Sequence, residues 1–176
     1  MTDKDMSIEF STPDGGNKKV PRHMAEYSLM VKRMVELYCQ DGPLTEAIPL
    51  LKLNSSTLNC LVDWMTKKAN NNDASNSSRS RESHHISDER YDGVDNRLQD
   101  WERNFFVNLP RKQLFQLMNA ANYMEIPSLV ESGSCFISER ISGLDLDQIR
   151  SYMNLRSDFN DEEENSLKQK YDWLNV

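Results

Sequence analysis

The sequence predicts an α/β architecture of the α+β kind, a small mixed sheet with helices, followed by an entirely helical C-terminal half. Three observations predict this architecture. Short alternating apolar runs stand near the N-terminus, apolar residues recur at helical spacing from about residue 97, and one long polar segment separates the two halves. With 176 residues, 38% of them hydrophobic, the chain is long enough for one modest core and an appended subdomain.

Residues 1–66 predict the order β-β-α-β-α. The runs Ile8–Phe10 and Lys18–Val20 flank a turn rich in Pro, Asp and Gly, which is typical of a β-hairpin. Ile48–Leu53 predicts a short strand at a sheet edge, because its proline cannot donate to a ladder. Apolar residues at helical spacing predict two helices: one capped by Ser28, with Val31, Met34, Val35 and Tyr38, and one capped by Ser55 or Ser56, with Leu58, Leu61, Val62 and Met65.

Residues 67–96 differ sharply in composition from the rest of the chain. They are rich in Asn, Ser, Asp, Arg and Glu and almost empty of large apolar side chains. Such a segment cannot bury enough surface to offset its ordering entropy. We therefore predict a disordered linker or a long loop.

Residues 97–176 predict helices throughout. Pro110 and Pro127 suit the first turns of two of them. Asp145 and Gln148 have the spacing of a capping box, and Asn160 can cap a last helix with an acidic first turn at 161–164. These acidic residues could bind a divalent cation or meet a basic partner. The missing calcium-loop pattern favours the other interpretation, a charged first helical turn.

Composition excludes several classes of function. A net charge of -7 argues against a general nucleic-acid binder, and no apolar run approaches the roughly 18 residues that span a membrane. The N-terminal residues lack the character of a secretory signal. Cys39, Cys60 and Cys135 are widely spaced within apolar-patterned segments, which indicates reduced core thiols in a cytoplasmic or nuclear protein.

Catalytic motifs are missing from the sequence. It contains no glycine-rich phosphate loop, no H-E-x-x-H and no C-x-x-C. His84 and His85 are adjacent and lie in the polar segment, where they could bind a metal weakly or simply be solvated. We expect no enzyme, no cofactor, no metal site and no small-molecule substrate. We predict instead an interaction domain that exposes an apolar groove between short helices.

Four segments carry a family resemblance. Residues 114–126, LFQLMNAANYMEI, are similar to LFELILAANYLDI, and DQIR at 147–150 with MNLRSDFNDEEE at 153–164 is similar to EEIRKTFNIKNDFTEEEE. Trp173 matches a near-terminal tryptophan, and residues 28–37 and 48–50 are similar to SVTIKTMLEDL and VPL. In these segments the chain resembles the S-phase kinase-associated protein family, the F-box-binding adaptors of SCF-type ubiquitin ligases.

The resemblance implies a BTB/POZ-type domain made by residues 1–66 and 97–141, with an F-box-binding helical extension at 142–176. The implied function is an adaptor that bridges the helical N-terminal domain of a cullin to an F-box substrate receptor. The resemblance places cullin contact at Asn122 and Tyr123. It places F-box contact at Ile149, Asn154, Leu155, Phe159 and Trp173.

Alternatives remain open for some of these residues. Tyr123 could serve helix packing alone, and Ile149 and Phe159 could belong to an internal core. The chain also departs from the family pattern, with Met153 in place of a phenylalanine and with Pro127 and Gly133 in a helix. The alternative function is an F-box partner or a BTB-type oligomerisation module that acts outside a cullin ligase.

Overall fold

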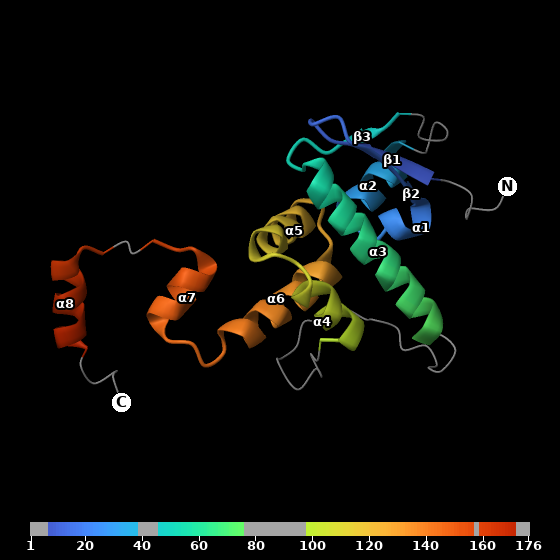
Figure 1. Cartoon of the computed structure of the whole chain (residues 1–176). Helices are drawn as coiled ribbons and strands as arrows, with labels where there is room; N and C mark the ends of the chain where they lie inside the picture. Colours follow the sequence, from blue (N-terminus) through green and yellow to red (C-terminus); the bar gives the residue numbers. More distant parts are fainter. Residues whose placement is uncertain (1–6, 39–45, 76–97, 157–158, 172–176) are drawn as a thin grey trace. The chain divides into compact units, whose positions relative to one another are not determined.

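The computed structural model describes residues 7–38, 46–75, 98–156 and 159–171 (Figure 1). The chain forms two compact units, Met1–Phe136 and Ile137–Val176. Its small sheet and many helices confirm the predicted α+β class. In chain order the elements are β1 (Ser7–Ser11), β2 (Asn17–Pro21), α1 (Arg22–Ala25), α2 (Leu29–Tyr38), β3 (Ile48–Pro49), α3 (Ser55–Ser75), α4 (Asp100–Val107), α5 (Arg111–Tyr123), α6 (Pro127–Ile141), α7 (Leu146–Met153) and α8 (Asp161–Lys170).

The sheet has the strand order β2-β1-β3. Strands β1 and β2 form the predicted antiparallel hairpin, and β1 pairs with β3 in parallel. Ile8 and Phe10 are buried while the residues between and beside them are not, as expected for side chains that alternate across a strand. Strand β3 is shorter than the predicted run to Leu53, because the N–H of Leu53 turns back to the carbonyl of Leu50 at 3.2 Å.

The hairpin turn is fastened to the start of α3. The N–H of Ser55 donates to the carboxylate of Asp14 at 2.8 Å. A Cβ atom at Gly16 would lie 2.2 Å from Ser55 Oγ, so only glycine allows this approach. The helix itself is capped by Asn54, whose Oδ1 accepts from the N–H of Thr57 at 2.8 Å. The predicted cap at Ser55 or Ser56 is therefore wrong, because Ser55 is already part of the contact with the turn.

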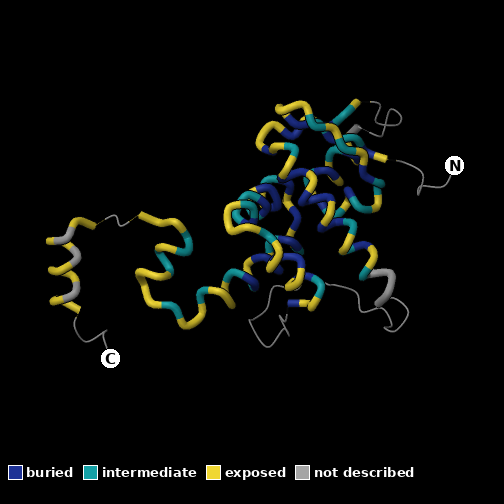
Figure 2. The backbone as a smooth tube through the Cα atoms, viewed as in Figure 1, coloured by how far each residue is buried: buried dark blue, intermediate teal, exposed yellow. Residues whose placement is uncertain are grey.

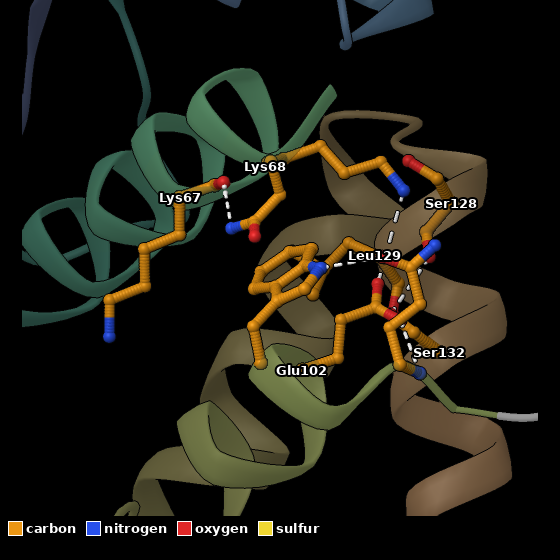
Figure 3. Close-up of polar contacts among 9 residues, drawn as sticks. Lys67, Lys68, Glu102, Ser128, Leu129 and Ser132 are labelled. Atoms are coloured by element: carbon orange, nitrogen blue, oxygen red, sulfur yellow. Dashed lines mark hydrogen bonds and ion pairs between the residues drawn. The ribbon is translucent and has the colours of Figure 1, made fainter. Parts of the chain in front are cut away.

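Helix α3 also corrects the predicted start of the polar linker, since residues 67–75 continue the helix. Lys68 explains part of this extension. Its Nζ lies 3.9 Å from a carboxylate oxygen of Glu102 in α4 (Figure 3). The same Nζ lies 5.7 Å from the ring centre of Trp64. A contact with a residue beyond the linker thus stabilises a segment whose composition alone predicts disorder. The rest of the predicted linker, with His84 and His85, lies outside the described residues.

The core of the first unit joins α3 to the helices that follow it. Trp64, Phe106, Leu117 and Leu129 are almost completely buried, and the rings of Phe106 and Phe136 lie 5.4 Å apart. Gly133 in α6 has a packing reason, because a Cβ there would meet Met118 Sδ of α5 at 2.1 Å. Helices α5 and α6 can therefore approach closely at this point.

The residues that the structure describes in the second unit form no comparable core. Helix α7 contains no buried residue, and every residue of α8 whose side chain is described is exposed (Figure 2). Helix α7 carries the predicted capping box, and α8 carries the predicted cap at Asn160, which Glu163 completes to a capping box. Gln148 N–H donates to Asp145 at 2.8 Å, and Glu163 N–H donates to Asn160 at the same distance. Local capping, rather than burial, specifies where these helices begin.

Candidate partner-binding surfaces

The two residues predicted for cullin contact stand at the end of α5. The side chain of Asn122 is exposed, while Tyr123 is half-buried. Lys52, which follows β3, places its Nζ 5.4 Å from the centre of the Tyr123 ring. Tyr123 therefore packs against its own domain and still presents part of its surface, and its predicted contact with a cullin stays a prediction.

A sharp elbow connects α5 to α6 directly after Tyr123. Glu125 adopts a left-handed backbone conformation with φ of 52°, which few residues other than glycine adopt. Two main-chain hydrogen bonds hold it: Ile126 N–H donates to Ala121 O and Leu29 N–H donates to Glu125 O, each at 2.9 Å. The carboxylate of Glu125 also pairs with Arg33 of α2. The elbow is therefore a fixed feature of the first unit.

An open hollow of about 490 Å³ lies at this elbow. Its walls come from α2, α5 and α6, and the lining is largely apolar. Spacing along the chain did not predict this hollow, because Leu29 is distant in sequence from the other lining residues. The hollow is lined by Leu29, Asn122, Glu125, Ile126, Pro127, Val130 and Glu131.

Helix α7 carries an apolar stripe. Ile149, predicted for F-box contact, is half-buried, as is Met153. Leu146 lies at i−3 from Ile149 on the same helical face, and 59% of its surface is exposed. Leu146 was not among the predicted contact residues, although its spacing of three and seven residues from Ile149 and Met153 was the available signal.

Asn154 and Leu155 end α7. Asn154 has φ of 55° and ψ of 39°, the left-handed conformation that commonly closes a helix and that asparagine tolerates. The N–H of Leu155 donates to Arg150 O at 2.9 Å, which completes the cap. Asn154 thus has a structural role besides the predicted binding role. Leu155 is 60% exposed, so the described residues of the unit do not cover this apolar side chain.

Helix α8 and the residues around it expose further apolar side chains. Phe159, which precedes the helix, is 49% exposed, so it is not an internal core residue in this structure. Leu167 and Tyr171, four residues apart on the same face, are also exposed. Trp173, the last residue predicted for F-box contact, lies outside the described residues.

The described parts of the chain contain no group of three or more His, Cys, Asp or Glu side chains that could hold a metal ion. Burial raises the pKa of the Cys60 thiol to about 11, with a smaller contribution from Asp63, so this thiol stays protonated at neutral pH. Cys60 is buried, which confirms the prediction of a core residue. Cys135 is half-buried, and Cys39 lies outside the described residues.

Hydropathy adds one observation on the helices. Among the described residues, no helix combines the length and the apolar character that a membrane span requires.

Comparison with known proteins identifies the class of this chain. Residues 6–70 match the Skp1 family tetramerisation domain, a POZ domain, and residues 127–174 match the Skp1 family dimerisation domain. The fold is thus a POZ domain with a helical extension. The chain belongs to the Skp1 family.

Relatives of similar length support this assignment. The E3 ubiquitin ligase complex SCF subunit sconC of Arthroderma otae is 28% identical over 174 residues, which cover 94% of this chain and 93% of the relative. The protein of the same name from Emericella nidulans is 29% identical over 166 residues, covering 94% of each chain. The one from Aspergillus terreus is 28% identical and covers 95% of each. The similarity therefore extends over nearly the whole chain.

Proposed function

We propose that this chain is the adaptor subunit of an SCF-type cullin-RING E3 ubiquitin ligase, which bridges the N-terminal domain of a cullin to an F-box substrate receptor. The observation that carries the proposal is the contrast between the two units. The first has its own buried core, while the second exposes Leu146, Leu155 and Phe159 and buries no residue of α7. Exposed apolar residues of this density are typical of a surface that a partner covers.

The F-box is the proposed partner of the second unit. The names of the sconC relatives, subunits of an SCF complex, support this choice. The contacts are proposed at Ile149, Asn154, Leu155, Phe159 and Trp173, with Leu146 added from the exposed stripe of α7. Burying one large apolar side chain contributes roughly 1.5–3 kcal/mol, so a few of them can account for a stable complex.

The cullin is the proposed partner of the first unit, at Asn122 and Tyr123. Both stand on the last turn of α5, beside an elbow that main-chain hydrogen bonds hold in place. A fixed backbone lowers the entropy that association costs. Because these residues belong to the first unit, a cullin would contact a surface that does not depend on α7 or α8.

The mechanism requires no bond chemistry from this chain. By holding the receptor and the cullin in one complex, the adaptor raises the effective concentration of a bound target near the catalytic subunits. The affinity comes from apolar side chains on the second unit. We place this activity in the cytoplasm, the nucleus or both, consistent with three cysteines that need no oxidising compartment.

A paired pull-down after co-expression tests the proposal. The wild-type chain and an Asn122→Lys/Tyr123→Lys double variant are each presented with a cullin N-terminal domain and, separately, with an F-box fragment. We expect wild type to bind both and the double variant to lose only the cullin. Wild type that binds the F-box but no cullin would instead support a partner outside a ligase. Wild type that binds neither would refute both functions.

A further inference from the structure

The ion pair between Lys68 and Glu102 belongs to a larger arrangement where α3 contacts α4. Trp64 and Lys68 are four residues apart in α3, so both side chains lie on one face of this helix. The Lys68 ammonium lies 5.7 Å from the ring centre of Trp64, 6.0 Å from that of Trp101 and 3.9 Å from a Glu102 oxygen (Figure 3). We call Trp64, Trp101 and Glu102 the cation box.

The first turn of α4 holds the parts of the cation box that follow the polar segment. Trp101 Nε1 donates to the side-chain oxygen of Gln99 at 2.6 Å, which orients the indole ring. The N–H of Gln99 donates to Glu102 Oε2 at 3.3 Å, while Glu102 Oε1 faces Lys68. One carboxylate therefore both caps α4 and contacts the cation.

Burial makes a positive charge necessary in the cation box. Trp64 is completely buried, and the side chains of Lys68 and Glu102 are only 19% and 6% exposed. A buried carboxylate that loses its counter-ion is strongly unfavourable, and an apolar side chain at position 68 supplies none. The faces of aromatic rings attract cations, most strongly those of tryptophan and where water is excluded. The box therefore selects for charge as well as for shape.

We propose that the cation box is a binding site for an alkylammonium ion, which the side chain of Lys68 fills in this chain. Aromatic faces recognise the ammonium groups of ligands by the same attraction. Because α3 ends at Ser75 and α4 begins at Asp100, the bound ammonium connects the two helices that flank the polar segment. A change at position 68 that removes the charge releases the start of α4, and a change that retains the charge does not.

Chemical rescue of the full-length chain tests the proposal. Lys68→Ala empties the box, and n-propylammonium chloride supplies the three methylene carbons and the ammonium that the substitution removes. Sodium chloride at the same concentration controls for ionic strength, and n-propanol controls for an uncharged molecule of similar shape. Lys112→Ala, at an exposed position in the first turn of α5, is the matched control variant. Thermal denaturation followed by circular dichroism measures the melting temperature.

We expect Lys68→Ala to lower the melting temperature by at least about 4 °C. Saturating n-propylammonium should recover at least half of this loss, because a ligand that binds the folded state stabilises it. Sodium chloride and n-propanol should recover none of it, and the Lys68→Ala/Glu102→Gln double variant should not respond to n-propylammonium. No recovery in Lys68→Ala, equal recovery with either control compound, or recovery in the double variant would each overturn the proposal.

Two further variants test the same claim without emptying the box, in case Lys68→Ala does not fold. Lys68→Arg retains the charge, and Lys68→Met has a similar length but no charge. We expect Lys68→Met to have the lower melting temperature, and faster amide hydrogen exchange in α4 than Lys68→Arg. Equal melting temperatures and equal exchange in these two variants would show that the box does not select for charge.

Discussion

The hydroxyl of Ser28 donates a hydrogen bond to the main-chain carbonyl of Met124, 96 residues further along the chain. The same oxygen accepts from the N–H of Val31 at 3.1 Å and so caps α2. One buried side chain therefore starts a helix and holds the end of α5, where Asn122 and Tyr123 stand. The surface proposed for the cullin depends on this serine for its position.

Replacing Ser28 with alanine removes both hydrogen bonds and leaves a buried carbonyl and N–H without this partner. We expect the free energy of unfolding to fall by about 1–3 kcal/mol, and the melting temperature by about 3–10 °C. Thermal denaturation followed by circular dichroism measures the change. Ser134→Ala, at an exposed position of α6, is the control. Equal melting temperatures for the two variants would contradict the role given to Ser28.

The contact between the hairpin turn and α3 predicts a pH dependence. Hydrogen bonds from the Thr12 hydroxyl, and next from Ser55, lower the pKa of Asp14 from 3.8 to about 2. Because the pKa in the folded state is below the ordinary value, the contact stabilises the fold above about pH 4 and is lost as the pH falls toward 2. Asp14→Asn should therefore lower the free energy of unfolding at pH 7. This difference from wild type should disappear as the pH falls toward 2. Urea denaturation from pH 7 to 2 measures this, and a deficit that is constant with pH would refute it.

The ion pair between Lys68 and Glu102 predicts coupling across the polar segment. Both side chains are mostly buried, with 19% and 6% exposed, and the N–H of Gln99 also donates to the Glu102 carboxylate. Glu102→Ala should lower the free energy of unfolding by about 1–3 kcal/mol. In a double-mutant cycle with Lys68→Met, the two changes should be non-additive by more than about 0.5 kcal/mol. Glu36→Gln, on the exposed face of α2, is the control. If the changes in the free energy of unfolding are additive, the contact between Lys68 and Glu102 contributes little.

Because apolar side chains of the second unit are exposed, we expect their replacement to weaken F-box binding without lowering the melting temperature. Leu155→Ala and Phe159→Ala should each weaken F-box binding about tenfold or more, the effect of losing roughly 1.5 kcal/mol of apolar burial. Neither should alter the melting temperature of the first unit, because neither side chain contributes to its core. Calorimetric titration with an F-box fragment measures the affinities. Gln169→Ala, at an exposed position of α8, is the matched control. Loss of binding in that variant as well would contradict the prediction.

Local signals in the sequence predicted the elements that local chemistry specifies. The hairpin follows from the alternation around Ile8 and Phe10, and the starts of α7 and α8 follow from the caps Asp145 and Asn160. Each of these features depends on residues within a few positions of one another. The prediction of α+β class followed from the same patterns.

Long-range contacts account for what the sequence did not predict. The cap of α3 moved to Asn54 because Ser55 contacts Asp14, 41 residues earlier. The extension of α3 depends on Glu102, which lies beyond the polar segment. The hollow at the elbow combines Leu29 with residues around Asn122. In each case the decisive partner is distant in sequence, where patterns of spacing carry no information.

The adaptor function requires that one chain binds a cullin and an F-box protein at the same time, through different units. Size-exclusion chromatography with light scattering, on a mixture of this chain, a cullin N-terminal domain and an F-box fragment, measures this directly. We expect a single complex whose mass equals one copy of each component. Two separate binary complexes, in which cullin and F-box exclude each other, would contradict the account.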